Sequence, residues 1–539
     1  MEKFLVISEV SKKQGYIFKT NKLKENIGAS AIIEYITEDL PKEKLSEVLG
    51  KDTKKIKEEN VVNAGGGNSL FILDNEDDAK KFISLTTKTV LKDFPGVEFF
   101  MAYQKFDYDK DSIIDAIDEI YKKLNDKKSA RASVFRKKSY GIEQNCVTTG
   151  LAAYKRYDDV FLSRESYVKR EWSKDEKQDK IKNTISDVIK EFEDRGYKFT
   201  KELEELITEK GDNSYVAIVS LDGNKMGQKI QHMKEEARKK EDKNNMAESN
   251  KKYIEKLTAF SNNIKKYYET AFTDMLNVID KNYDKVSESL KLKDNIIPVR
   301  PIILAGDDVC FICNAKIALE CVNLFIKSLN KHSVEDEQLN ACAGICMLRS
   351  SYPFDKGYEI AENLCKNGKA KIVDSNDASL VDFHICQGEI STSLSEIRNR
   401  AHINKEIELN IKPFYINITE VENNSQKSSD KKYERVITEE NTFNTYENFK
   451  AEFKRIEQKT KDCKGKIRKL RDIFPQGEEK TRLFMNKNMI ADEFNHGFKL
   501  PKGKVNYGFY ELDGKKTCLY FDIIELQDMF INLDSDIEG

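Results

Sequence analysis

The chain is poor in the residues that mark several whole classes of protein. It has 8 Pro and 1 Trp, and neither charge dominates, because 91 basic residues stand against 93 acidic ones for a net charge of −2. This balance removes any global electrostatic argument for nucleic-acid binding and leaves only the case for a local basic patch. With 39% hydrophobic and 34% charged residues, the composition excludes disordered and fibrous proteins. The 539 residues suffice for three or four domains.

Long apolar runs are also missing. No segment approaches the roughly 20 residues of a membrane-spanning helix, and the apolar stretch near the N-terminus is too short for a signal peptide. We therefore expect a cytoplasmic protein with no membrane partner, whose 10 Cys are reduced thiols. The pair Cys310 and Cys313 lies in a strand-like run, where residues three apart face opposite sides. Core packing is therefore favoured over a metal or redox role.

The first part of the chain alternates between strand and helix patterns. We expect a strand at 4–10, a helix at 22–37, a hairpin at 60–73, a helix at 77–94 and a strand at 97–106. The order β-α-β-β-α-β is the ferredoxin-like plan. Residues 1–110 are therefore assigned to a first domain of this kind.

The same order returns after a polar, mostly helical connection at 111–212. It comprises a strand at 214–223, a hairpin at 301–313, a helix at 315–332, a strand at 339–349 and a helix at 353–372. A second domain is assigned to 213–400, with a charged helical insertion at about 226–295, and a small helical domain to 401–539. A repeated topology indicates internal duplication. The predicted fold is α+β, with two ferredoxin-like domains and helical connecting and C-terminal domains.

The hairpin of the second repeat carries two adjacent carboxylates, Asp307 and Asp308, after Ala305 and Gly306. Like charges this close raise each other's pKa, and a bound divalent cation removes the penalty. Asp222 ends the first strand of the same repeat, and the first and third strands are central neighbours in a ferredoxin-like sheet. We therefore expect these three carboxylates to converge as catalytic ligands of two Mg²⁺ or Mn²⁺ ions, which prefer hard oxygen donors.

Two glycines fit the same chemistry. Gly306 lets the backbone approach a phosphate, and Gly223, predicted to lie against the metal, has no side chain to obstruct it. Two ions at this edge would activate an attacking hydroxyl and stabilise a leaving pyrophosphate. The alternative is a hairpin in which Asp and Gly merely favour the turn; the duplicated unit favours catalysis.

At these residues the sequence resembles the large, palm-containing subunit of type III CRISPR effectors, the cyclic-oligoadenylate synthase family, which is itself similar to GGDEF diguanylate cyclases. The matching motifs occur in order along nearly the whole chain. They are ISEVSKKQGYIFKTNKLKENIGAS, NAGGGNSLFIL, SLDGNKMG, LAGDDVCF, AGICMLRSSYPF and KNGKAKI. The resemblance implies two palm domains that join nucleoside triphosphates, usually ATP, into cyclic or short oligonucleotide second messengers in antiviral defence, with release of pyrophosphate.

The resemblance also implies the site residues. Asp222, Asp307 and Asp308 carry metal and catalysis. Nucleotide contacts in the second palm come from Gly223, Asn224, Ala305, Gly306 and Lys371. The hairpin of the first palm lacks a carboxylate pair, with Asn68 and Ser69 after its glycines, and this palm is expected to be a non-catalytic partner that offers a face to a second nucleotide. Its residues are Gly28, Ala29, Ser30, Gly65, Gly66, Gly67 and Asn68. Lys371 has a second interpretation, because a lysine near a helix C-terminus stabilises the helix dipole.

Three departures from the family pattern leave alternatives open. Ala305 replaces the first glycine of the hairpin, and Asn224 replaces the second aspartate of the strand element. The family's frequent HD nuclease is not expected, since none of the 5 His is followed by Asp. The two substitutions favour a catalytically weak or inactive nucleotide-binding subunit of a type III-like effector. A template-dependent polymerase is disfavoured by the near-neutral charge and the lack of a basic or aromatic track.

The expected partners are nucleoside triphosphates together with either other CRISPR-type subunits and RNA, or a second copy of the chain. A composite site between the two palms predicts that Gly66→Val suppresses product formation, because it adds bulk to the first-palm hairpin. Donor nucleotide and metal should still bind at Asp222 and Asp307. Mass spectrometry of the products and calorimetric titration with a nucleotide analogue measure the two properties. A variant that folds and turns over like wild type would place the second nucleotide elsewhere, for instance on another copy of the chain.

Overall fold

The computed structural model describes most of the chain. The described residues are 1–65, 67–130, 141–178, 184–207, 214–372, 378–386, 393–401, 403–404, 407–416, 444–495, 497–498, 500, 505–512 and 515–533. Within these ranges no helix combines the length and the apolar character that crossing a membrane requires.

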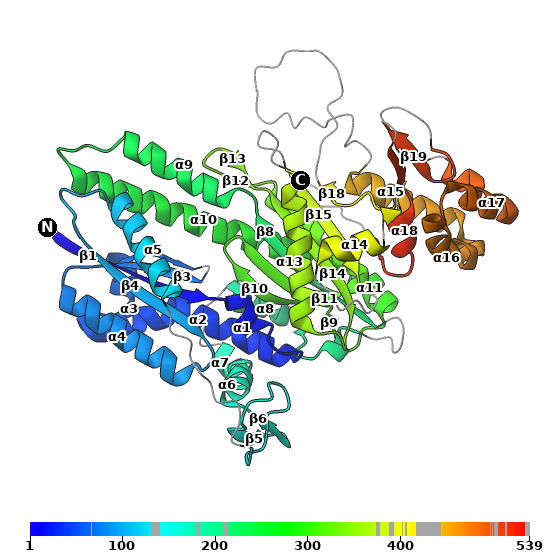
Figure 1. Ribbon diagram of the computed structural model, residues 1–539. Helices are drawn as coiled ribbons and strands as arrows, with labels where there is room; N and C mark the ends of the chain where they lie inside the picture. Colours follow the sequence, from blue (N-terminus) through cyan, green and yellow to red (C-terminus); the bar gives the residue numbers. More distant parts are fainter. Residues whose placement is uncertain are drawn as a thin grey trace.

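The N-terminal domain is built on a four-stranded antiparallel sheet in the order β2-β3-β1-β4, coloured blue in Figure 1. Its strands are β1 Glu2–Ser11, β2 Val61–Gly65, β3 Asn68–Leu73 and β4 Glu98–Asp107. Its helices are α1 Lys13–Ile17, α2 Leu23–Leu49, α3 Thr53–Glu59 and α4 Glu76–Asp93. This strand order is that of a ferredoxin-like domain and confirms the predicted topology.

Alternation along β1 gives this sheet two apolar faces. Phe4 and Val6 pack with Phe71 of β3 and Phe82 of α4, whereas Leu5 and Ile7 belong to the core on the other face. That second face is covered by α5 Ile113–Ser129, which we had assigned to the connecting region. Strand β1 is therefore buried on both faces and forms the middle of the domain.

Helix α2 is longer than the pattern predicted. It was expected to end at residue 37 but runs to Leu49, past Pro41. Leu40 and Leu45 on its added length are almost fully buried, so tertiary packing outweighs the local cost of the proline.

The second domain repeats the same sheet and extends it. Its order is β10-β11-β8-β14-β15-β18, and the first four strands again have the ferredoxin-like arrangement. The strands are β8 Tyr215–Gly223, β10 Val299–Ala305, β11 Asp308–Asn314, β14 Ala341–Arg349, β15 Ser379–Ile385 and β18 Phe414–Ile416. Helices α12 Ala318–Leu329 and α13 Phe354–Ala370 complete the unit. The predicted duplication is confirmed.

The charged insertion forms three helices, α9 Met226–Lys239, α10 Met246–Lys281 and α11 Tyr283–Leu290. Helix α10 is 36 residues long and contacts both β2 of the first sheet and α12 of the second domain. In Figure 1 it runs beside the first sheet toward the second. The insertion therefore joins the two domains as well as covering a surface.

The C-terminal part contains the expected helices together with a small sheet that the sequence analysis missed. The helices are α15 Tyr446–Lys459, α16 Lys464–Ile473, α17 Glu478–Asn488 and α18 Phe521–Glu525. The strands, in the order β16-β17-β20-β19, are β16 Ile403–Asn404, β17 Ile407–Glu408, β20 Lys515–Cys518 and β19 Phe509–Leu512. Strands of two to four residues carry too little alternation to be recognised, and β17 pairs with a strand about one hundred residues away.

The connecting region contributes short strands and helices. They are β5 Lys155–Tyr157, β6 Val160–Leu162, α6 Arg164–Trp172, α7 Asp175–Gln178 and α8 Thr184–Asp194. Helix α8 packs on β10 of the second domain and on α10, whereas α6 packs on α2 of the first domain. Helix α6 lies so close to α2 that a Cβ on Gly28 would overlap the carbonyl oxygen of Lys169. Trp172 packs against Tyr35 and Phe94 of the first domain.

The thiols of β11 behave as predicted. Cys310 and Cys313 are both buried but belong to different core clusters, so they face opposite sides of the sheet. All ten cysteines are free.

Gly28→Ala should lower the free energy of unfolding by about 1–3 kcal/mol, the usual cost of overpacking, because α6 must retreat from α2. Gly465→Ala in α16 is the matched control: a Cβ there meets nothing within 4 Å, so stability should stay level or rise slightly. Denaturant midpoints at constant slope measure both changes. Equal midpoints for the two variants would show that the α2–α6 contact is not tight.

Candidate active site

The register of two central strands brings the predicted carboxylates together. Asp308 at the start of β11 lies directly opposite Asp222 on β8, and directly opposed residues present their side chains on the same face. Asp307 is in the turn between β10 and β11, beside Gly306 with φ of 67°. The Gly223 N–H donates to the Asp307 carbonyl oxygen at 3.3 Å. The three carboxylates therefore share one end of the sheet.

Two lysines, one from each domain, meet this cluster. The Lys369 Nζ from α13 lies 2.7 Å from the Asp222 Oδ2 and donates to the Gly223 carbonyl oxygen at 2.8 Å. The Lys13 Nζ from α1 of the first domain lies 2.9 Å from the Asp308 Oδ2. The acidic end of the second sheet is thus contacted by basic groups from both sides of the boundary between the domains.

Asp307 is the carboxylate most strongly affected by its surroundings. Burial, with the negative charge of Asp222 as the next cause, raises its pKa from 3.8 to about 6. Asp308 adds to the rise and Lys369 opposes it. A half-buried carboxyl beside two others is a place where an additional positive charge would be stabilising.

These residues offer oxygen donors that fit a divalent cation shared with a substrate. Among the described residues, no three His, Cys, Asp or Glu side chains gather closely enough to hold a metal ion by themselves. Mg²⁺ commonly takes only one or two carboxylates from a protein and completes its shell with water and phosphate. Asp222, Asp307 and the Gly223 carbonyl could supply such a partial set, and the raised pKa of Asp307 marks the charge that a cation would offset. The two-ion arrangement remains a prediction.

Gly223 is required by the crowding around this turn. A Cβ at that position would lie 2.6 Å from the Tyr268 hydroxyl, 2.8 Å from the Met226 Cε and 2.9 Å from the Asp307 Cβ. A side chain there would therefore force Tyr268, Met226 or Asp307 to shift. The glycine that sequence analysis associated with metal and phosphate has at least this packing role.

Two predicted nucleotide contacts do not join the cluster. The Asn224 side chain is 1% exposed, and its Nδ2 donates to the Ala378 carbonyl oxygen at 2.8 Å; its contact with nucleotide stays a prediction. Lys371 is exposed at the end of α13, whereas Lys369 reaches Asp222. Residues two apart on a helix point about 200° from each other, so only one of these lysines can face the carboxylates. The phosphate role predicted for Lys371 remains untested.

A small cavity between the domains collects predicted residues from both repeats. Ser30, Gly67 and Ala305 line it together with Lys13, and the Ser30 hydroxyl donates to the Ile302 carbonyl oxygen. Its volume is about 30 Å³, which is room for about one water molecule. A nucleotide could enter only after a lining side chain moved.

The other first-palm predictions divide by the face on which each residue lies. Gly28 packs against α6 and Ala29 is fully buried, so both have a packing role, and their contact with nucleotide stays a prediction. Gly65 and Asn68 close the β2–β3 hairpin as a cross-strand pair. Gly66 lies outside the described residues.

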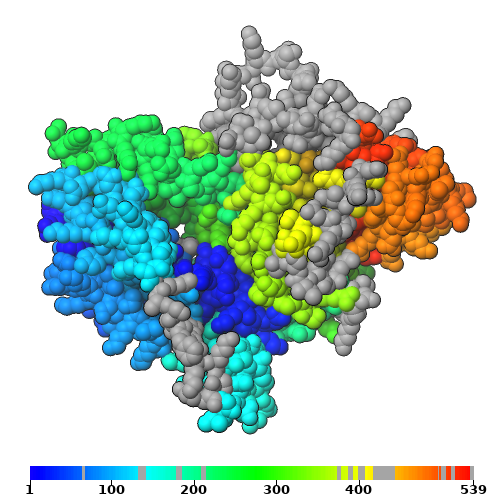
Figure 2. Space-filling view, in the orientation of Figure 1, coloured from blue at the N-terminus to red at the C-terminus, as the bar shows by residue number. Residues whose placement is uncertain are grey.

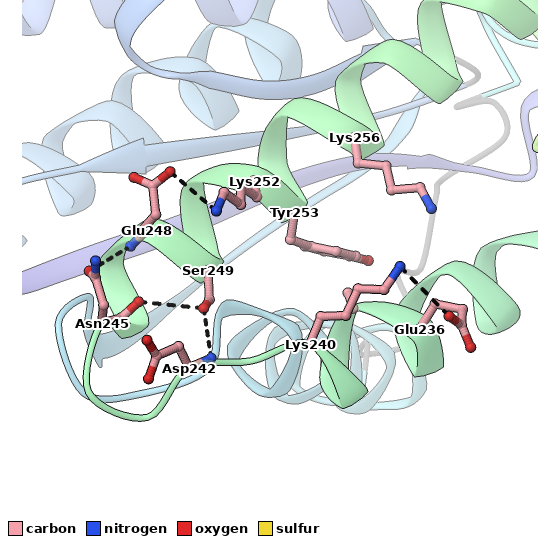
Figure 3. A pocket seen from close by; sticks show the side chains of 10 residues that line it. Glu236, Lys240, Asp242, Asn245, Glu248, Ser249, Lys252, Tyr253 and Lys256 are labelled. Carbon is pink, nitrogen blue, oxygen red and sulfur yellow. Dashed lines mark hydrogen bonds and ion pairs between the residues drawn. The ribbon is translucent and has the colours of Figure 1, made fainter.

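A second cavity, of about 260 Å³, opens between α9 and α10. Figure 3 shows Lys240, Lys256 and Tyr253 on its walls. None of the predicted site residues lines it, and it lies on the insertion rather than at the carboxylates.

The raised pKa of Asp307 predicts a pH-dependent effect of Asp307→Asn on stability. A carboxyl whose pKa is higher in the folded state loses its favourable contribution as pH rises from about 4 to about 6. Asp307→Asn removes the buried charge, so it should stabilise the fold by about 2 kcal/mol above pH 7, and this difference should disappear near pH 4. Thermal unfolding in metal-free buffer, with the exposed Asp126→Asn as control, measures it. A difference independent of pH would contradict the raised pKa.

Comparison with known proteins follows the same division of the chain. Residues 215–378 match the family model described as Cas10/Cmr2, second palm domain. No curated protein matches the chain at the significance required.

Three solved structures illustrate the likeness. The chain aligns over 98% of its length, with a TM-score of 0.52 and 12% identity, to 69% of a chain in a Csm1–Csm4 cassette in complex with pppApApA. An apo Csm1–Csm4 cassette gives a TM-score of 0.44 at 12% identity over 74% of this chain and 58% of that one. Csm1 in T. onnurineus gives 0.43 at 13% identity over 70% and 52%. The chain therefore spans less than two thirds of these last two chains.

The Csm1–Csm4 cassette with pppApApA shows that the likeness in fold extends over nearly the whole chain. The family match covers the strands and helices that position Asp222, Asp307, Asp308 and Lys369. The match supports the resemblance inferred from the sequence: residues 215–378 are similar to the second palm domain of Cas10/Cmr2.

Proposed function

We propose that this protein is a metal-dependent nucleotidyltransferase that joins nucleoside triphosphates, with ATP as the first candidate, into cyclic or short oligonucleotide messengers of type III CRISPR defence. The observation that carries the proposal is the juxtaposition of Asp222, Asp307 and Asp308 at the boundary of two palm-like domains. Those carboxylates have no role in core packing, and their mutual repulsion opposes folding.

The residues have distinct tasks in this reaction. Asp222, Asp307, Asp308 and the Gly223 carbonyl would hold Mg²⁺ or Mn²⁺, which when bound would polarise the attacking hydroxyl and the phosphate. Asp307 must be ionised to do so, and this occurs above the pKa of about 6. Lys369 is placed to neutralise phosphate charge, because its ammonium group already lies 2.7 Å from Asp222. Gly306, in a left-handed conformation at the turn, leaves backbone exposed to phosphate.

A second candidate is a nucleotide-binding subunit that performs no chemistry. Lys369 and Lys13 pair with Asp222 and Asp308, and the cavity between the domains is small, which favours this alternative. Incubation of the protein with each nucleoside triphosphate and Mg²⁺ or Mn²⁺, followed by mass spectrometry, separates the candidates. The binding subunit would retain nucleotide and release no product or pyrophosphate.

The working partners are part of the proposal. A solved structure of similar fold holds Csm1 with Csm4, which supports a further protein subunit as a companion of this chain. A second copy of the chain is the alternative partner. Activity assays therefore compare the isolated protein with the protein co-expressed with its neighbouring subunits.

Asp307→Ala combined with Asp308→Ala should abolish product formation, because it removes two of the three carboxylates that would hold the cation. The fold should remain intact, with little loss of thermal stability, or even a gain, in metal-free buffer. Asp77→Ala with Asp78→Ala, another adjacent pair at the start of α4 in the first domain, is the control and should keep wild-type activity. Product formation at the wild-type rate by the first double variant would refute the catalytic assignment.

A further inference from the structure

Lys13 is the one residue of the first domain whose side chain joins the acidic cluster in an ion pair among the described residues. Its side chain is 19% exposed and that of Asp308 is 20% exposed, so the pair is largely shielded from water. Gln14 approaches the same oxygen of Asp308 at 3.4 Å. The contact crosses the boundary between the two domains, and it therefore depends on how the domains pack together.

The backbone that carries Lys13 is firmly held. Lys169 of α6 donates to the Tyr16 carbonyl oxygen at 2.7 Å, and its ammonium lies 3.9 Å from the centre of the Tyr16 ring. On the other side, Phe18 stacks on Tyr358 of α13 with ring centres 4.3 Å apart. Figure 2 shows the dark blue N-terminal residues set directly against the yellow-green surface of the second domain. The Lys13 side chain can therefore move without moving α1.

The same side chain also forms a wall of the cavity between the domains. Its stem passes over Gly67, where a Cβ would meet the Lys13 Cδ at 3.4 Å. Ser30 and Ala305 line the same cavity. A swing of the ammonium group away from Asp308 would both enlarge this space and leave a positive charge at its edge.

We propose that Lys13 is a nucleotide-phosphate ligand supplied by the first domain, and that it exchanges Asp308 for phosphate when that carboxylate takes a divalent cation. The inference rests on the proposed function and extends it to the second nucleotide. One carboxylate oxygen cannot serve an ammonium group and a divalent cation at the same position, because the two positive charges repel. Phosphate oxygens in the enlarged cavity then replace the lost partner with charge-assisted hydrogen bonds.

The test uses Lys13→Met, which keeps the length of the side chain and removes its charge. The matched control is Lys12→Met. The side chain of Lys12, the neighbouring residue, is 62% exposed, and its Nζ lies 3.7 Å from the Glu98 Oε1 of the first sheet rather than beside the acidic cluster. Binding of Mn²⁺ alone is followed by electron paramagnetic resonance, and binding of a non-hydrolysable ATP analogue with Mg²⁺ by calorimetry. Lys13→Met should bind Mn²⁺ more tightly, because its competitor is gone, and bind the analogue about tenfold more weakly. Lys12→Met should match wild type, and Lys13→Arg should restore analogue binding.

The opposite signs of the two effects separate the proposal from a structural role. If Lys13 had only a structural role, Lys13→Met would bind both Mn²⁺ and the ATP analogue more weakly and would have a lower melting temperature. That result would overturn the inference, and so would unchanged affinity for both ligands. A wild-type protein that binds no nucleotide would refute the proposed function and the phosphate contact with it. The Mn²⁺ measurement decides the Lys13–Asp308 competition separately, and unchanged Mn²⁺ affinity in Lys13→Met would refute that part.

Discussion

The gathering of three carboxylates at one end of the second sheet, with Asp307 partly buried in the turn, is the constraint on which the surrounding contacts depend. Asp222 and Asp308 are fixed opposite each other by the register of β8 and β11, and Asp307 follows in the turn with a pKa raised to about 6. A fold that served stability alone would separate these charges. Instead the surrounding residues balance them, with Lys369 from the same domain and Lys13 from the other.

That balance depends on contacts across the boundary between the two domains. Helix α10 contacts elements of both domains, and the Ser30 hydroxyl of α2 donates to a carbonyl oxygen of β10. The β2–β3 hairpin of the first domain carries Asn68 and Ser69 where the second domain has its carboxylate pair, yet the first domain contributes Lys13, Ser30 and Gly67 to the cavity beside Ala305. The second domain supplies the carboxylates and the first supplies Lys13. Such an arrangement can divide the binding of two nucleotides between the two repeats.

The connecting region contacts the segment that carries Lys13. A buried network, in which Glu165 binds both Lys169 and Lys19, ties α6 to the start of the first domain. Such a network is costly to desolvate and is disrupted strongly when one partner is removed. Because α6 fixes the backbone from which Lys13 extends, a change in this region would alter the neutralisation of Asp308 without touching the carboxylates.

The sequence by itself determined the two repeats and the acidic end of the second one. Strand and helix periods of the two copies are local properties, and the ferredoxin-like order follows from them, so the pairing of Asp222 with the hairpin could be predicted. Tertiary structure alone decided which neighbours surround that end. Lys369 rather than Lys371 faces Asp222, because residues two apart on a helix point in nearly opposite directions. Gly28 and Ala29 pack in the interior, whereas Ser30 lines the cavity. The Asn224 side chain donates a hydrogen bond to the Ala378 carbonyl oxygen. Lys13 was passed over because it is an ordinary charge in a local pattern; it reaches Asp308, 295 positions further along the chain, only when the two domains pack together.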